Sequence, residues 1–210
     1  MNVKMSSILG AVAFALVVVA ALGAGFYLYM HRQGGERATN SRTLPGAPEI
    51  GGSFSLTDDT GRPVSEKTLV GEKYHLIFFG FAHCPDICPG MLTTMAGVYE
   101  KLPPATRGKL QMVFVSVDPD RDSAEKLHEF VRGFDPSFVG WRGSQAEVDA
   151  MTKNYLAYAA KRADPDAPDG YTMDHSAILY LMGPDGKYVM HMRNSDSATL
   201  IRERLEEVVR

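Results

Sequence analysis

Two cysteines, Cys84 and Cys88, stand in the segment FGFAHCPDICPG, and a proline directly follows each of them. Three residues separate them, so in a helical turn their side chains lie one turn apart on one face. Pro85 and Pro89 each suit the first position of a helix, which predicts that both cysteines lie at helix starts. Backbone N–H groups there favour the thiolate, which binds metals or attacks a disulfide.

A purely structural disulfide is the main alternative to a functional pair of cysteines. A bond between Cys84 and Cys88 closes so small a loop that it removes little entropy from the unfolded chain. The spacing therefore favours a functional pair, either metal-binding or redox-active.

A third ligand would complete a metal site, and His175 is the best placed of the six histidines. It follows a long acidic segment and directly precedes the apolar run SAILYLM, so the segment is able to fold over the cysteine turn. His83 adjoins Cys84 but points the other way in extended chain, and we interpret it as a surface residue. Two thiolates and one imidazole suit Cu(I), and with an open position they also resemble a catalytic zinc site.

Three acidic residues are candidates to tune the charge of this site or to orient a ligand. Asp86 lies between the cysteines, Asp118 ends an apolar run, and Asp174 precedes His175. Turn formation and helix capping are the competing interpretations of all three.

The elements around these residues alternate between strands and helices. The apolar run YHLIFFGF at 74–81 predicts a central strand that is buried on both faces and ends just before Cys84. The other elements expected from periodicity and caps are a small hairpin over 53–65, a helix at 91–102, a buried strand at 110–119, a helix opened by Ser123, a strand at 138–143, a helix at 144–159 opened by Ser144 with Glu147, a loop at 161–174, a hairpin at 176–192 and a closing helix at 195–210.

This order predicts a three-layer α/β domain with a mixed central sheet. In such sheets the functional groups gather at the carboxyl ends of the strands. Cys84 follows the end of the first buried strand, so the chemistry is expected there.

The N-terminal part predicts a membrane anchor over residues 1–30. No charge occurs from Ser6 to Met30, and residues 8–30 form about 35 Å of helix, enough to cross a bilayer. A cleaved signal peptide is the alternative, although its apolar region is usually only about 7–15 residues long. Residues 31–52 are polar and rich in Gly and Pro, which predicts a linker before a domain at 53–210.

Charge and cysteine count exclude some functions. Outside the first thirty residues, 21 basic residues stand against 25 acidic ones, a formal charge of −4, so nucleic acid is not an expected partner. Two cysteines make no disulfide framework, and the fold must be held by its core. Arg32, Arg37 and Arg42 follow the anchor while Lys4 precedes it, and this count alone places the domain in the cytoplasm.

Three motifs together resemble the Sco/SenC copper-binding proteins in order and separation: GFAHCPDICP from Gly80, VSVDPDRDS from Val115 and YTMDHSAILYLMGPDG from Tyr171. The resemblance spans the domain from about Phe54 to the last helix. It implies a thioredoxin-like fold, a membrane anchor, and delivery of copper to the dinuclear copper centre of cytochrome c oxidase subunit II during assembly. The family's ligands correspond to Cys84, Cys88 and His175.

Two departures from the family pattern leave these ligands untouched. Ala82 stands where the family often has threonine, and Gly90 with Met91 replaces a common pair of threonines. The resemblance also implies that the domain lies outside the cytoplasm, which overrules the charge count. No mitochondrial transit peptide is visible, so the expected location is a bacterial inner membrane with the domain in the periplasm.

These observations predict a metallochaperone rather than an enzyme, with another copper chaperone or a thioredoxin-like reductase as further partners. The first alternative is a thiol-disulfide oxidoreductase that reduces the cysteines of the oxidase subunit or of another extracytoplasmic protein, with Cys84 attacking and Cys88 resolving. No proline immediately precedes the strand after His175, where thioredoxins place a cis-proline. Peroxide sensing and zinc binding are the remaining alternatives.

Overall fold

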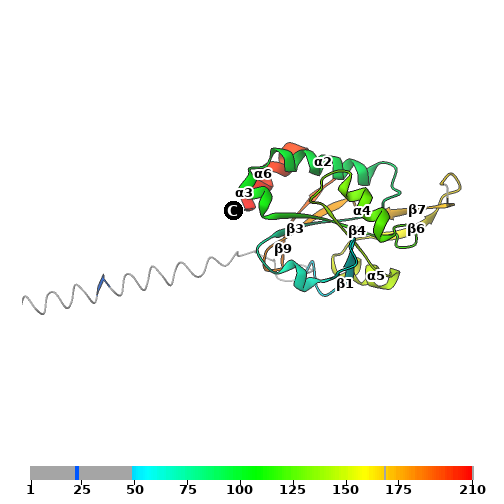
Figure 1. Ribbon diagram of the computed structural model, residues 1–210, viewed down its shortest axis with the longest axis horizontal. Coiled ribbons are helices and arrows are strands. Elements are labelled where there is room, and N and C mark those ends of the chain that lie inside the picture. The colour runs from blue at the N-terminus through cyan, green and yellow to red at the C-terminus, as the bar shows by residue number, and fades with distance from the viewer. Residues whose placement is uncertain (1–21, 24–48, 168, 210) are drawn as a thin grey trace, which may run out of the picture. The chain divides into compact units, whose positions relative to one another are not determined.

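The computed structural model describes residues 22–23, 49–167 and 169–209 (Figure 1). The predicted anchor at 1–30 and the predicted linker at 31–52 therefore lie almost wholly outside the described residues. Within the described part of the chain, no helix is both long enough and apolar enough to cross a membrane.

The domain is built on a seven-stranded sheet with the order β2-β1-β5-β4-β3-β8-β9. Strand β3 lies parallel to β4 and antiparallel to β8, so the sheet is mixed, as predicted. The bounds of its strands are β1 (Ser55–Asp58), β2 (Pro63–Ser65), β3 (Tyr74–Gly80), β4 (Leu110–Ser116), β5 (Val139–Arg142), β8 (Ile178–Met182) and β9 (Tyr188–Arg193).

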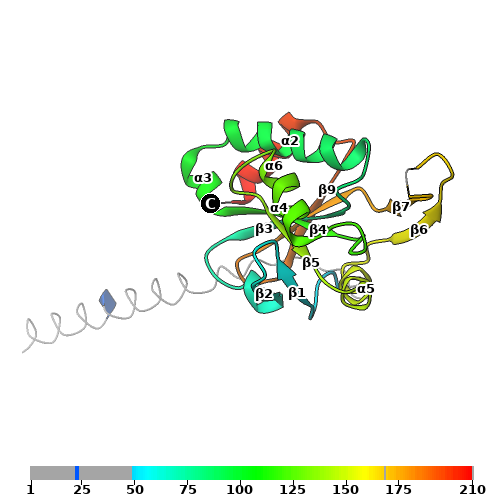
Figure 2. The same ribbon diagram turned by 45° about the vertical axis from the view of Figure 1, so that its right-hand side comes forward.

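Helices cover both faces of this sheet, which confirms the three-layer prediction (Figure 2). Side chains of α2 and α4 pack on one face, where Leu127 lies against Gly140 of β5. Tyr155, at the end of α5, packs against Phe79 on the opposite face. The helices are α2 (Ile87–Lys101), α3 (Pro104–Gly108), α4 (Ala124–Arg132), α5 (Gln145–Asn154), α6 (Ala198–Val208) and the short 3-10 helix η1 (Glu66–Leu69).

Strand β3 is the centre of the core. Its residues from Leu76 to Phe79 are fully buried, because β4 and β8 flank the strand and side chains cover both of its faces. Phe78 meets Phe114 on the α2 side, while Phe79 meets Tyr180 on the other. Burying one such aromatic side chain stabilises the fold by about 1.5–3 kcal/mol, so the strand that leads to the cysteines is held firmly.

The predicted helix caps are present. Ser144 and Glu147 form a capping box at the start of α5, and the Ser123 side chain accepts a hydrogen bond from the N–H of Lys126 at the start of α4. The predicted extent of α5 was too long, because the helix ends at Asn154 and Leu156 takes a left-handed backbone conformation with a φ of 53°. The short helix α3 was not predicted.

The segment 161–174, expected to be a loop, forms most of a β-hairpin instead. Strands β6 (Ala159–Ala163) and β7 (Tyr171–His175) pair antiparallel as a separate two-stranded sheet. Strand β6 is half-buried to exposed and has the sequence AAKRA, which shows no apolar alternation, and the alternation in β7 (YTMDH) is too short to stand out from the polar segment before it. The figures show this hairpin extending away from the main sheet.

Candidate metal centre

The two cysteines lie where β3 gives way to α2. The chain leaves β3 at Gly80 and turns through a hydrogen bond from the N–H of Cys84 to the carbonyl of Phe81, 3.2 Å long. The N–H of Cys88 then donates to the Sγ of Cys84 at 3.4 Å, so the two side chains share one end of the turn. Both are free thiols.

The prediction that both cysteines lie at helix starts is only half correct. Helix α2 begins at Ile87 after the N-cap residue Asp86, so Cys88 is in its first turn but Cys84 lies before the cap. Cys84 still receives a helix-end N–H group, that of Cys88, because the preceding turn folds back over the helix start.

Gly80 makes room for the buried cysteine. A Cβ atom at this position would lie 2.7 Å from the Sγ of Cys88 and 2.9 Å from the ring of Phe114. Any larger residue would therefore displace the sulfur or the ring. The last residue of β3 thus sets how closely Cys88 packs on the sheet.

His175, the last residue of β7, meets the cysteines from the hairpin. Its Nε2 atom lies 3.4 Å from the Sγ of Cys88, and its Nδ1 lies 3.3 Å from the carbonyl oxygen of Ser176. A carbonyl only accepts, so Nδ1 carries the proton of the neutral ring and Nε2 presents a lone pair toward the sulfur. The ring meets Phe78 and Phe81 edge-on at 5.9 and 5.8 Å between centroids.

The ligand atoms of Cys84, Cys88 and His175 all lie within 4.8 Å of one another. Cys88 is buried, whereas Cys84 and His175 are half-buried, so a metal ion held by the three would be reachable from one side. That side opens into a cleft of about 300 Å³ lined by residues 84–87 and 172–175 together with Phe81. A larger cavity of about 630 Å³ lies by β1 and the start of α5, and neither cysteines nor histidines line it.

The two thiols differ in acidity. A hydrogen bond from the Cys88 thiol, together with the backbone N–H groups of Cys88 and Asp86, lowers the pKa of Cys84 far below its ordinary value, although burial acts in the opposite direction. Sharing its proton with the Cys84 thiolate, together with burial, raises the pKa of Cys88 well above the ordinary range. At neutral pH the pair is therefore one half-buried thiolate beside one buried thiol.

The three candidate acids occupy different places. Asp86 lines the cleft as the N-cap residue of α2, but its side chain forms no capping hydrogen bond. Asp118 accepts a hydrogen bond from the hydroxyl of Tyr171 at 3.0 Å, so it contacts the hairpin. Asp174 accepts from Nε of Arg162 at 3.2 Å, across the hairpin.

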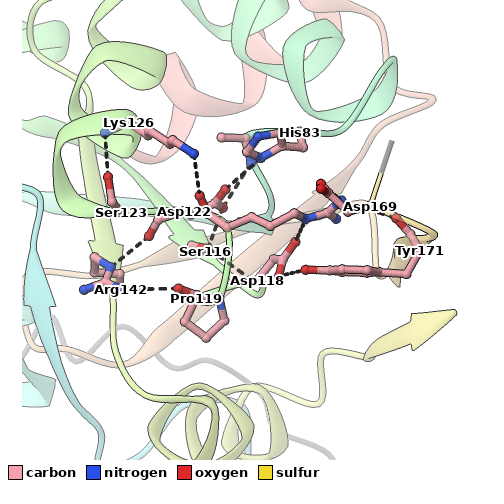
Figure 3. Close-up of polar contacts among 12 residues, drawn as sticks. His83, Ser116, Asp118, Pro119, Asp122, Ser123, Lys126, Arg142, Asp169 and Tyr171 are labelled. Atoms are coloured by element: carbon pink, nitrogen blue, oxygen red, sulfur yellow. Dashed lines mark hydrogen bonds and ion pairs between the residues drawn. The ribbon is translucent and has the colours of Figure 1, made fainter. Parts of the chain in front are cut away.

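A fourth acid, Asp122, was not among the predicted site residues, and it supports the segment before Cys84 (Figure 3). Its buried carboxylate accepts hydrogen bonds from the Ser116 hydroxyl at 2.6 Å and the Ala82 N–H at 3.1 Å, and it lies 3.4 Å from Nδ1 of His83. Burial raises the pKa of Asp122. The sequence did contain a signal for Asp122, which lies in the charged run directly after β4. The parallel neighbours β3 and β4 end at the same edge of the sheet, so residues after β4 lie close to the segment before Cys84.

Comparison with known proteins agrees with this geometry. A family model described as SCO1/SenC matches residues 42–210. The chain is 38% identical over 164 residues to Protein SCO1 homolog 1, mitochondrial, of Arabidopsis thaliana; the match covers 78% of this chain and 48% of that protein, so the chain spans about half of that relative's length.

Solved structures give the same result. The copper-bound structure of Bradyrhizobium japonicum ScoI is 37% identical, with a TM-score of 0.66, and the match covers 75% of this chain and 98% of that one. The structure of BsSco, described as a Sco family cytochrome c oxidase assembly protein with a disulfide switch, is 25% identical with a TM-score of 0.58, over 76% of this chain and 93% of that one. The sequence motifs, the mixed sheet and the joined Cys-Cys-His cluster therefore agree with the family match: this chain belongs to the SCO1/SenC family.

Proposed function

We propose that this protein is a copper metallochaperone that acts in the assembly of cytochrome c oxidase. The observation that carries the proposal is the convergence of Cys84, Cys88 and His175 within 4.8 Å at the carboxyl end of β3. Copper is the cargo of this site rather than a resident cofactor. The relatives described above support the choice, because one was solved with copper bound and another is described as an oxidase assembly protein.

The ligand set favours Cu(I). Thiolates are soft ligands, and two of them with one neutral imidazole provide a low-coordination site that suits this ion. Cys84 is already a thiolate, and binding removes the proton of the Cys88 thiol. Because the cleft leaves one side open, thiolates of an acceptor are able to approach the metal and replace the three ligands in steps.

The acceptor that we propose is cytochrome c oxidase subunit II, with its dinuclear copper centre. Residues 1–30 anchor the protein in a bacterial inner membrane, residues 31–52 form a linker, and residues 53–210 form the copper-binding domain in the periplasm. The uncharged stretch from Ser6 to Met30 and the family resemblance support this arrangement. Another copper chaperone or a thioredoxin-like reductase would load or reduce the site.

Copper titration tests the proposal. The reduced protein, titrated anaerobically with Cu(I) against a chromogenic chelator, binds about one ion per chain. Replacing Cys84 or Cys88 by Ser, or His175 by Ala, lowers the affinity by at least about 100-fold, more than the loss of a group that only supports a ligand. Unchanged affinity in His175→Ala would contradict a three-ligand site.

A thiol-disulfide oxidoreductase is the second candidate, and the unequal acidity of the cysteines favours it. The Cys84 thiolate attacks a partner disulfide and releases one partner thiolate. The Cys88 thiol, after losing its proton, attacks Cys84 in the mixed disulfide; the partner leaves with both cysteines reduced, and Cys84 and Cys88 become the disulfide. This activity requires both cysteines and survives His175→Ala, so the same variant separates the two candidates.

A further inference from the structure

The hairpin β6–β7 carries His175 but does not belong to the main sheet. Its two strands pair with each other as a separate sheet, and Figure 2 shows them extending beyond the seven-stranded one. Ladder hydrogen bonds to β3, β4 or β8 therefore do not fix its position. The His175 end is fixed by the chain, since β8 begins at Ile178 and the N–H of Ser176 donates to the carbonyl of Tyr158 at 2.9 Å. At the Tyr171 end, contacts between side chains must hold the strand.

Arg121 supplies the densest of these contacts, from the loop between β4 and α4. Its side chain is only 11% exposed, and its guanidinium lies 3.9 Å from the centroid of the Tyr171 ring. Nη1 donates to the carbonyl oxygen of Tyr171 at 3.3 Å and lies 3.4 Å from the carboxylate of Asp169. Nε of Arg121 donates to Asp118. Asp118 also accepts a hydrogen bond from the Tyr171 hydroxyl (Figure 3). The planar, fixed guanidinium thus binds the start of β7 from several directions.

The neighbouring residue in the same loop binds the other half of the site. The Asp122 carboxylate accepts a hydrogen bond from the N–H of Ala82 and faces the ring of His83. These two residues directly precede Cys84. Arg142 of β5 fixes the loop by donating to the carbonyl oxygens of Asp122 and Pro119 at 2.9 and 3.4 Å. One loop therefore contacts both the cysteine segment and the histidine hairpin.

The two ends of β7 are held differently. At its end the His175 ring contacts Phe78 and Phe81 of the core, and at its start Tyr171 contacts Arg121. Four residues of strand, about 13 Å, separate these two points. If the Tyr171 end is freed, only the contacts at the His175 end hold β7, and motion of the strand then shifts the imidazole relative to the sulfurs.

We propose that Arg121 is a positioning residue that keeps His175 in the metal site. The cysteines come from the turn after β3 and the first turn of α2, outside the hairpin, so loss of Arg121 leaves a two-thiolate site whose third ligand is only transiently present. The inference rests on the proposed copper site, and it adds that the lifetime of bound copper is set by a residue that does not touch the metal.

Hydrogen exchange in the reduced, metal-free protein tests the contact without copper. Arg121→Gln keeps a polar side chain but removes the charged guanidinium group. The backbone amides of β6 and β7 then exchange at least about 10-fold faster than in the wild type. Arg162→Gln is the matched control on the same hairpin, because Arg162 pairs with Asp174 and Asp164 within that hairpin and is 55% exposed. Wild-type exchange in the hairpin of Arg121→Gln would overturn the proposal, whatever the copper measurements give.

Transfer of Cu(I) to a chelator then tests the link to His175. Arg121→Gln accelerates copper loss by about 10- to 100-fold, the usual effect of losing a group that orients a ligand, whereas Arg162→Gln does not. In a His175→Ala background the same Arg121 substitution has no further effect, because its target is already absent. Equal acceleration in both backgrounds would show general destabilisation and refute the positioning role.

A milder variant covers the case in which Arg121→Gln does not fold. Tyr171→Phe removes only the hydroxyl that donates to Asp118 and keeps the ring under the guanidinium. It produces a smaller change in the same direction in both measurements; no change in either would count against the proposal. Failure of the wild type to bind Cu(I) would refute the proposed function, while hydrogen exchange still decides whether Arg121 holds the hairpin.

Discussion

The Sγ atom of Cys88 lies 3.4 Å from Nε2 of His175, although the two residues are 87 positions apart in the chain. Cys88 is fully buried on the first turn of α2, and the histidine reaches it from the end of a hairpin outside the main sheet. The hydrogen bond from Nδ1 to the carbonyl of Ser176 leaves the facing nitrogen with a lone pair. The fold thus brings an imidazole nitrogen and two sulfurs together from three separate parts of the chain.

Alkylation distinguishes the two cysteines. In the reduced protein iodoacetamide labels Cys84, which is half-buried and has a strongly lowered pKa, and spares Cys88, which is buried and has a raised one. Because the Cys84 thiolate persists well below pH 7, its labelling rate, measured by mass spectrometry, changes little between pH 6 and 8. A rate that rises about tenfold per pH unit, as for an ordinary thiol below its pKa, would contradict the account. Both cysteines label after denaturation.

Gly80→Ala moves the buried sulfur. The added methyl group would lie 2.7 Å from Sγ of Cys88 and 2.9 Å from the Phe114 ring, and such overpacking costs about 1–3 kcal/mol. We expect lower stability in denaturant unfolding and weaker Cu(I) binding. Gly97→Ala is the control, because nothing lies within 4 Å of its Cβ and the substitution in α2 stabilises by about 0.5–1 kcal/mol. A stable Gly80→Ala protein with wild-type affinity would show that the close contact is dispensable.

His75 makes the domain sensitive to acid. It is 7% exposed, Nδ1 has no hydrogen-bond partner among the described residues, and burial, with a smaller effect of Lys73, lowers its pKa to about 4. Between its ordinary pKa of 6.5 and about 4, the unfolded chain binds more protons, so stability falls as the pH falls through this window.

The loss attributed to His75 is up to about 3 kcal/mol. Urea unfolding of the metal-free protein at pH 7 and pH 4.5 measures it as the difference between the wild type and His75→Gln. The same substitution at the exposed His191 leaves the wild-type dependence in place. If His75→Gln also keeps the wild-type loss of stability between pH 7 and pH 4.5, the buried ring of His75 is not the source of that loss.

Leu156 stores strain at the end of α5. Its φ of 53° is left-handed, and the N–H of Ala157 closes the helix by donating to the carbonyl of Thr152, an arrangement that favours glycine. Leu156→Gly relieves up to about 1 kcal/mol and raises the Tm by about 2–4 °C. Leu156→Ala keeps a Cβ atom and gains nothing. An equal gain in both variants would point to the exposed side chain, which is 53% accessible, rather than to the backbone.

The alternation of strands and helices was predictable because each core element carries its own signal. The run that ends before Cys84 is apolar on both faces since it is buried on both faces, and the serine caps mark helix starts directly. The choice of His175 came from its place before a buried strand, and the structure brings its ring to the cysteines.

The hairpin and the Arg121 contacts were not predictable from these signals. Strands β6 and β7 bury few side chains, so the pattern of their residues predicts a polar loop rather than two strands. The positioning role that we propose for Arg121 depends on the groups around its guanidinium, and Tyr171 among them is 50 positions away in the chain. Local periodicity carries no information about such a contact.

X-ray absorption at the copper edge tests the central claim most directly. In the anaerobically reduced protein loaded with one Cu(I), the account predicts two sulfur neighbours and one nitrogen neighbour, from Cys84, Cys88 and His175. The His175→Ala protein keeps the two sulfurs and loses the nitrogen. A wild-type copper ion surrounded by nitrogen and oxygen alone, or a spectrum that His175→Ala leaves unchanged, would contradict the proposed site.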